Sequence, residues 1–335
     1  MKILGMTAAL LLMCAVIWLS NDSFASGPNL FNNTRQVALL GIYAVGVGFV
    51  IISGGIDLSI GSVIGLAAVV TVKLSAGADR GGLGLPLTLG IAAAMALSMA
   101  LGLLQGLLIT RAGLQPFILT LCGMLIYRGV SQTILGGGDI SFGDSQVAAV
   151  SLFVSEIGEG FLLGIPWPVV IFLVVMGAAA FLLHFTVFGR YLFAIGGNRE
   201  AARYSGIPVR TVETITYVVS AGLAGLAGVV HAAYLPQVNH QVGIGYELTA
   251  IAAAVLGGCS LRGGEGSIPG ILIGAAIMQV IDNGINLFRI PLGGGRTWRL
   301  DENWKHIIIG GVILGAVSLD GILHKLRQGR GGGKS

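Results

Sequence analysis

The chain has 335 residues, of which 54% are hydrophobic and only 10% are charged. In soluble domains about a quarter of the residues are charged, so this composition excludes an ordinary soluble domain and predicts an all-α polytopic membrane protein. The net charge of +4 does not indicate a nucleic-acid partner, because the basic residues lie scattered between apolar segments instead of forming one stripe. The three cysteines lack metal-ligand spacing, and we expect no metal site.

Apolar segments predict about ten transmembrane helices in a single domain, 1–335. The predicted spans are 3–19, 36–53, 58–76, 86–110, 114–135, 161–185, 212–235, a half-helix at 247–258, 267–288 and 303–319. We expect the first span to be retained, since its apolar stretch is longer than most signal-peptide cores. Ten spans place both termini on the same side of the membrane, and more of the basic residues lie on that side than on the other. Basic residues are more frequent on the cytoplasmic side, so both termini should be cytoplasmic. A flexible basic tail is expected at 321–335.

Glycines interrupt the apolar pattern at corresponding places in the two halves. Gly54-Gly55-Ile56-Asp57 separates the second and third spans, and the run to Gly65 aligns with Gly257-Gly258-Cys259-Ser260-Leu261 followed by 266–270. Lipid cannot satisfy the backbone groups that such a break leaves free, so each break should face protein or water. This predicts two loosely related halves with discontinuous helices, which are typical of transport pathways.

Asp57 is the informative charge of the first break. A carboxylate at the centre of a membrane helix costs about 2.5 to 3.5 kcal/mol, so Asp57 should be paired, hydrated or near the interface. One interpretation places it at a pathway or gate together with Gly54, Gly55 and Ser59. The other makes it a cap for the third span. Both remain open.

A second group of polar residues lies in the ninth predicted span. Asp282, Asn283 and Asn286 fall on one helical face, where they could line a polar pathway and offer donors and acceptors to sugar hydroxyl groups. Hydrogen bonding between helices is the alternative for each of them.

The longest charged island is a loop at 187–211, between the sixth and seventh spans. Short loops rich in Lys and Arg stay in the cytoplasm, so the loop should be cytoplasmic. Its middle predicts a short helix, with Asn198 as N-cap and Glu200 in the first turn. Gly206, followed by Pro208, should end that helix.

The string Glu200-Ala201-Ala202, followed by Ser205-Gly206, resembles the coupling loop that ABC importer permeases insert into a groove of their ATPase subunits. The wider string 189–207 is similar to that of permeases for ribose and related monosaccharides. The resemblance extends from about residue 30 to 325 and includes the Gly-Gly-Ile-Asp-Leu-Ser run at 54–59. It implies that Asn198, Glu200, Ala201, Ala202, Ser205 and Gly206 contact an ATPase.

The resemblance also implies partners and a location. These are an ABC ATPase subunit that binds ATP, a periplasmic sugar-binding protein, and a second permease copy or paralogue, with this chain in the bacterial inner membrane. The chain itself should carry no cofactor and no catalytic site. The tail Gly329-Arg330-Gly331-Gly332-Gly333-Lys334-Ser335 does not fit a phosphate loop, because its required first glycine would fall at Gln328.

Other classes of function fit part of the sequence. An ion- or proton-coupled secondary transporter would use the repeat and Asp57, but leaves the string in the 187–211 loop unexplained. Within the leading class, a permease for branched-chain amino acids, autoinducer-like sugars or nucleosides is an alternative to a monosaccharide permease. A membrane-bound enzyme would need a catalytic cluster, which the sequence does not offer.

Overall fold

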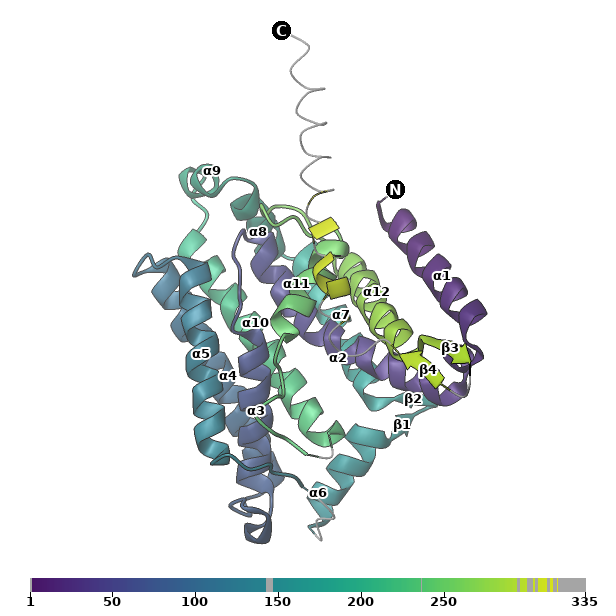
Figure 1. Cartoon of the computed structure of the whole chain (residues 1–335). Coiled ribbons are helices and arrows are strands. Elements are labelled where there is room, and N and C mark those ends of the chain that lie inside the picture. Colours follow the sequence, from purple (N-terminus) through teal and green to yellow (C-terminus); the bar gives the residue numbers. More distant parts are fainter. Residues whose placement is uncertain are drawn as a thin grey trace.

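The computed structural model describes residues 2–142, 147–235, 237–293 and 296–299, together with 304, 307–311, 314–315 and 318. This part of the chain is mainly helical (Figure 1). Seven of its helices are long and apolar enough to cross a membrane, and two shorter apolar helices accompany them. The predicted all-α polytopic membrane fold is confirmed.

The helices follow one another with short connections. They are α1 (Lys2–Ser20), α2 (Gly27–Ile52), α3 (Ile60–Ser75), α4 (Leu87–Thr110), α5 (Pro116–Leu135), α6 (Ala148–Leu152), α7 (Trp167–Phe185), α8 (Val187–Gly197), α9 (Arg199–Tyr204), α10 (Val209–Tyr234), α11 (Tyr246–Leu256) and α12 (Ile268–Leu287). Two 3-10 helices, Asp22–Ala25 and Ala78–Arg80, and a π-helix, Phe153–Glu159, lie between them.

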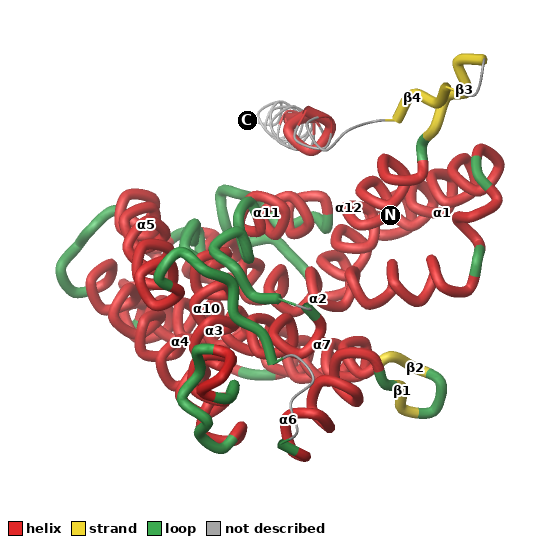
Figure 2. Tube along the Cα trace, turned by 60° about the horizontal axis from the view of Figure 1, so that its bottom comes forward, coloured by secondary structure: helices red, strands yellow, loops and turns green. Residues whose placement is uncertain are grey.

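Two small antiparallel hairpins complete the described structure. Strands β1 (Phe161–Leu162) and β2 (Ile165–Pro166) form one, and β3 (Arg289–Gly293) and β4 (Arg296–Arg299) form the other. Figure 2 shows both hairpins at the periphery, outside the packed helices.

The core is centred on α2. In α2, 83% of the apolar window is buried, against 22% in α5 and α7 and none in α1. α2 packs against α7, α10, α11 and α12, so its apolar residues meet protein on every side. The exposed apolar faces of α1, α4, α5 and α7 are the surfaces expected to meet lipid.

Small residues allow α4 and α10 to approach closely. A Cβ atom on Gly102 would lie 2.5 Å from the carbonyl oxygen of Tyr217, and one on Gly106 would lie 2.9 Å from the Cα atom of Thr214. These glycines are one helical turn apart, which is the small-xxx-small spacing of tightly packed membrane helices. The close packing holds the first half of the chain against α10.

Two predicted boundaries were wrong. The second span begins at Gly27 instead of 36, because Pro28 occupies the first turn, where a proline costs no hydrogen bond. The sixth begins at Trp167 instead of 161, because Leu163 and Gly164 adopt positive φ angles of 54° and 81° in the hairpin turn and cannot continue a helix.

The remaining span predictions agree more closely with the structure. The half-helix predicted at 247–258 is α11, with 11 residues, and the breaks at 53–59 and 257–267 are present. The segment 136–160, between the fifth and sixth predicted spans, contains α6 and the π-helix. In the tenth predicted span, 303–319, residues 304, 307–311, 314–315 and 318 are described and are helical, and the others lie outside the described residues, as does the whole tail, 321–335. The boundaries 1–335 and 187–211 remain predictions.

Candidate functional site

The predicted short helix of the 187–211 loop is α9. Asn198 is its N-cap, and the Asn198 side-chain oxygen accepts a hydrogen bond from the Ala201 amide at 3.0 Å. Glu200 lies in the first turn, where the helix dipole favours an acid. The loop also contains α8, which the sequence analysis did not predict; Thr186 caps α8 at the Gly189 amide.

Gly206 ends α9 as predicted. Its φ angle is 80°, and its amide donates to the carbonyl of Arg203 at 3.1 Å. The Ile207 amide donates to the carbonyl of Ala202 at 3.1 Å, and this pair of bonds defines a Schellman motif. Asn198 and Gly206 thus fix both ends of a helix of only six residues.

One face of α9 is buried and the other is exposed. Ala202 packs inward with 4% exposure, whereas Glu200, Ala201 and Ser205 are exposed. Tyr204 is 86% exposed, and a large aromatic side chain so exposed is a common anchor in protein interfaces. Tyr204 lies inside the quoted string, but it is not among the residues predicted to contact an ATPase. The exposed face is therefore available to a partner.

A bidentate ion pair joins α9 to α10. The Arg199 guanidinium donates from Nε to Oε1 of Glu213 at 2.7 Å and from its terminal nitrogen to Oε2 at 3.0 Å. The hydrogen bond to Glu213 raises the pKa of Arg199 above its ordinary value, so the guanidinium remains charged. Parallel bonds of this kind fix orientation as well as distance. The pair therefore holds α9 against the start of α10.

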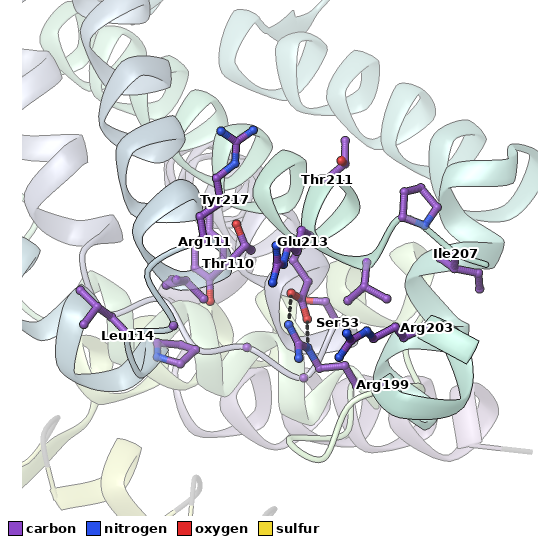
Figure 3. Close-up of a pocket in the computed structure, with 18 of the residues that line it drawn as sticks. Ser53, Thr110, Arg111, Leu114, Arg199, Arg203, Ile207, Thr211, Glu213 and Tyr217 are labelled. Atoms are coloured by element: carbon purple, nitrogen blue, oxygen red, sulfur yellow. Dashed lines mark hydrogen bonds and ion pairs between the residues drawn. The ribbon is translucent and has the colours of Figure 1, made fainter. Parts of the chain in front are cut away.

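The ion pair borders a cavity of about 800 Å³ (Figure 3). The first break supplies Gly54 and Gly55, and the turn between α4 and α5 supplies Arg111. Arg199, Arg203 and Arg210 also line it, so among its charged lining residues the basic ones outnumber the acidic Glu213. Arg199 and Arg203 belong to α9, so this cavity lies beside that helix.

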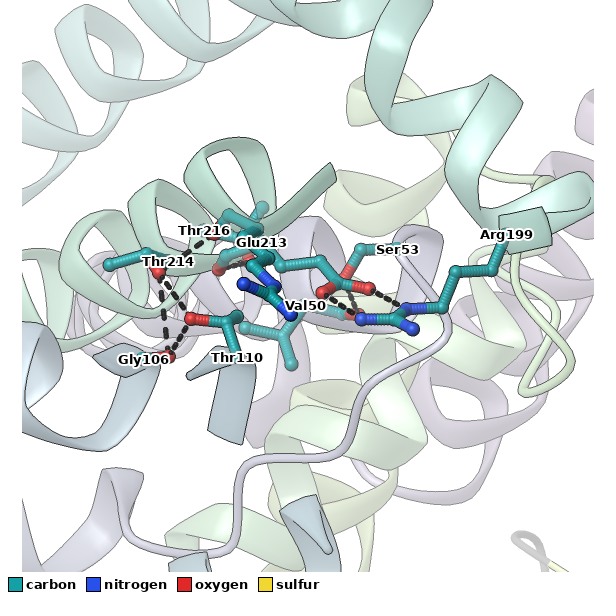
Figure 4. A network of polar contacts seen from close by, with 9 residues as sticks. Val50, Ser53, Gly106, Thr110, Arg199, Glu213, Thr214 and Thr216 are labelled. Atoms are coloured by element: carbon teal, nitrogen blue, oxygen red, sulfur yellow. Dashed lines mark hydrogen bonds and ion pairs between the residues drawn. The ribbon is translucent and has the colours of Figure 1, made fainter. Parts of the chain in front are cut away.

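A polar network continues from the ion pair toward α4 (Figure 4). Thr214 follows Glu213 on α10, and its hydroxyl lies 3.0 Å from that of Thr110. Both hydroxyls also bond the carbonyl of Gly106, at 2.7 Å from Thr110 and 3.4 Å from Thr214. The network ties the ends of α4 and α10 together beside the cavity.

The two glycine breaks meet the end of α8. The Gly264 amide donates to the carbonyl of Ile52, the last residue of α2, at 2.9 Å. Gly196, near the end of α8, lies so close that a Cβ atom would overlap both this oxygen and the Gly264 nitrogen. The end of α8, which precedes α9, is therefore packed closely between the break after α2 and the break after α11.

The two breaks have the same backbone geometry, but the residues that correspond to each other differ from those paired in the predicted alignment. Gly54 and Gly258 have φ angles of 85° and 88° and end α2 and α11 with the same pattern of hydrogen bonds. Gly54 therefore corresponds to Gly258, not Gly257. The following helices begin after Ser59 and Ser267, whereas the predicted alignment paired Ser62 with Ser267.

Asp57 is fully buried. It lines neither the cavity beside α9 nor a second cavity, which is described below. Its Oδ1 accepts from the Ser59 amide at 3.0 Å and from the Ser59 hydroxyl at 2.7 Å. Its Oδ2 accepts from the Ser220 hydroxyl of α10 at 3.3 Å. The carboxylate therefore holds the turn before α3 and links that turn to α10.

The polar residues of α12 lie elsewhere, in a second cavity of about 360 Å³. Asp282 accepts a bond from Asn286 at 3.2 Å, so these two lie on one face as predicted. Asn283 exchanges hydrogen bonds with Asn29 at 2.8 and 3.1 Å, which is the contact between helices that was the alternative. The predicted pathway residues therefore form two groups that do not share a cavity.

No group of three or more His, Cys, Asp or Glu residues able to hold a metal ion occurs among the described residues.

The helices, the interrupted spans and the exposed α9 define a polytopic membrane permease. Residues 29–317 match the family described as branched-chain amino acid transport system / permease component. The chain belongs to this family.

Several relatives match nearly the whole chain. The ribose import permease protein RbsC of Escherichia coli K12 is 40% identical over 312 residues, covering 93% of this chain and 91% of that protein. RbsC of Bacillus subtilis is 38% identical, with coverage of 96% and 93%. The D-allose transport system permease protein AlsC of E. coli K12 is 34% identical, with coverage of 92% and 87%. The resemblance to ABC importer permeases is confirmed.

Proposed function

We propose that this chain passes a monosaccharide, ribose or a close relative, across the bacterial inner membrane as the permease of an ABC importer. The similarity to proteins named for ribose and allose import supports the choice of sugar over branched-chain amino acids, nucleosides or autoinducer-like sugars. The observation that carries the mechanism is α9, a helix capped at both ends, exposed on one face and tied to α10 by Arg199 and Glu213.

In this proposal the 187–211 loop and both termini face the cytoplasm, and the exposed face of α9 docks in a groove of a separate ATPase subunit. Binding and hydrolysis of ATP occur on that subunit, so this chain needs no cofactor and catalyses no reaction. ATP-driven movement of the ATPase pair displaces α9. The ion pair and the closely packed end of α8 pass that displacement to α10 and to both breaks.

The other partners follow from the same proposal. A periplasmic binding protein delivers the sugar to the side opposite α9, and a second copy of the permease, or a paralogue, pairs with this chain. The binding protein sets much of the choice of solute. Gly54, Gly55, Asp57 and Ser59 form the region whose movement opens the cytoplasmic side.

Reconstitution in proteoliposomes tests the proposal. The permease, its ATPase and its binding protein should together import radiolabelled D-ribose only when ATP is present on the ATPase side. Uptake driven by a proton or sodium gradient without the ATPase would instead establish the secondary-transporter alternative. Omission of the binding protein serves as the control for leakage.

A further inference from the structure

The second cavity lies at the end of the molecule away from α9. It is lined by residues of α2, α10, α11 and α12 and by Ile309. Gln36 lies in the first half of α2, His231 near the end of α10, and Asp282 near the end of α12, and in Figure 1 these helix ends lie far from α9. If α9 is cytoplasmic, this cavity belongs to the external half of the protein.

His231 is the unexplained group in this cavity. Its side chain is buried, with 3% exposure, yet neither ring nitrogen has a hydrogen-bond partner among the described residues. A buried polar atom without a partner destabilises a protein, so such atoms in native proteins call for an explanation. The ring lines the cavity, where a ligand can reach it. A neutral imidazole presents one donor and one acceptor, which matches a pair of hydroxyl groups.

Aromatic rings lie beside the imidazole. The Tyr246 ring is 5.5 Å from the His231 ring, measured between centroids, and is stacked on Tyr43 at 5.7 Å with an angle of 7° between the planes. All three residues line the cavity. Their faces offer apolar contact for the C–H groups of a ring, and their polar tips offer hydrogen bonds. This combination suits a ligand with apolar faces and a polar rim.

The other lining groups favour a neutral ligand. Gln36, Gln279, Thr249 and Asp282 add amide, hydroxyl and carboxylate groups, and no Lys or Arg is among the described residues that line the cavity. An anionic ligand would bring its charge close to the Asp282 carboxylate. The cavity volume of about 360 Å³ is at the small end of the range for small-molecule sites, about 300 to 1,000 Å³. A monosaccharide fits this chemistry and this size.

We propose that this cavity is a monosaccharide-binding site within the permease. In it, His231 exchanges hydrogen bonds with sugar hydroxyls, and the Tyr43 and Tyr246 rings contact the carbon skeleton. The inference rests on the proposed function and adds that the permease itself holds the sugar after a binding protein releases it. The rival occupant is ordered water, which would satisfy the imidazole without a role in transport.

Direct binding tests the site without the ATPase or the binding protein. The probe is D-ribose, added to the full-length permease in lipid nanodiscs and detected by saturation-transfer difference NMR, with succinate as an anionic control. We expect saturable ribose binding that His231→Phe weakens at least about tenfold, because the variant keeps the ring and removes both nitrogens. The matched control is His184→Phe, since His184 is exposed on α7.

Each result supports or overturns the site. Ribose signals no larger than those of empty nanodiscs, or equal binding by His231→Phe and wild type, would mean that the cavity holds water only. His231→Gln should bind within a few-fold of wild type, because an amide also supplies a donor and an acceptor. If His231→Phe does not fold, Gln279→Leu replaces it, since this residue lines the same cavity from α12.

Uptake by the reconstituted complex separates this inference from the proposed function. ATP-driven ribose uptake that persists at the wild-type rate in a folded His231→Phe complex overturns the site and leaves the function intact. Loss of uptake with normal assembly and binding-protein-stimulated ATP hydrolysis supports the site, because the defect then lies in the pathway. Absence of ribose uptake by the wild-type complex overturns the proposed function itself.

Discussion

Arg199 on α9 and Glu213 on α10 are joined by two parallel hydrogen bonds, of 2.7 and 3.0 Å, at the rim of the larger cavity. The Glu213 side chain is 12% exposed and that of Arg199 is 52% exposed, so one partner is largely shielded from water. The pair connects the proposed docking helix to a helix that packs against α2, α3 and α4. It is a direct charged link between α9 and the helices of the membrane core.

Glu213→Gln should reduce coupling more than it reduces stability. Half of the pair faces solvent, so its loss should cost about 1 kcal/mol or less of unfolding free energy. Ribose uptake per ATP hydrolysed should fall about fivefold, because the amide no longer fixes the guanidinium. The charge exchange Arg199→Glu with Glu213→Arg should recover part of the loss. Equal coupling in Glu213→Gln and wild type would show that the pair does not transmit motion.

Gly196 and Gly197, at the end of α8, allow a matched test of the close contact between α8 and the two breaks. A Cβ atom on Gly196 would overlap backbone atoms of Ile52 and Gly264, whereas one on Gly197 would meet no atom within 4 Å. Gly196→Ala should therefore destabilise the permease by about 1 to 3 kcal/mol, the usual cost of overpacking. Gly197→Ala should be close to neutral. Thermal unfolding of both variants in detergent measures the difference, and equal midpoints contradict the close approach.

Local patterns predicted the helices and their ends. Asn198 and Gly206 were identified from residue type alone, because an N-cap and a left-handed C′ residue depend on a few neighbouring atoms. The breaks at Gly54 and Gly258 were found in the same way, although their register was wrong by one residue. A glycine pair shows where a helix stops but not which of its members takes the positive φ angle.

Contacts between distant segments could not be predicted from local sequence patterns. Glu213 is a lone acid in an apolar helix, and an acid in such a place usually has a partner, which could have directed attention to it. The identity of that partner, Arg199, depends on how the chain turns between α9 and α10. For His231 the sequence offers only the signal of a polar residue in a predicted span, since the rings of Tyr43 and Tyr246 are brought to it by folding.

Substitutions of Asp57 can distinguish a structural carboxylate from an ion site. Asp57→Leu leaves two hydroxyls and one amide without their acceptor and should impair both stability and uptake, by about 1 to 3 kcal/mol for each buried group left unpaired. Asp57→Asn keeps one acceptor oxygen for Ser59 and should retain much of the activity. Uptake and thermal unfolding are measured together. A stable but inactive Asp57→Asn permease would show that the charge itself is required.

The orientation of the 187–211 loop can be tested by cysteine labelling. Ser205 is exposed at the end of α9, and Cys14, Cys122 and Cys259 are first replaced by serine or alanine. An impermeant maleimide should not label Ser205→Cys in intact cells. It should label the same variant after permeabilisation in a strain that lacks the ATPase. Labelling in intact cells would invert the proposed topology.

Gly206 tests whether α9 is the coupling element. Its φ angle of 80° lies in the left-handed region, which costs other L-residues about 1 to 2 kcal/mol and β-branched residues most. Gly206→Val should therefore distort the end of α9, which is exposed and carries little of the core. The variant should insert and fold normally, yet co-purify poorly with the ATPase and show reduced binding-protein-stimulated ATP hydrolysis.

The control for this substitution is Gly206→Asn, because asparagine tolerates the left-handed conformation and often replaces glycine at this position. No atom lies within 4 Å of a Cβ at Gly206, so backbone strain and not a steric clash would distinguish the two variants. Gly206→Asn should retain most of the ATPase association and ribose uptake. If Gly206→Val also retains both at the wild-type level, the shape of this helix end does not matter for docking, and α9 is a connector without a coupling role.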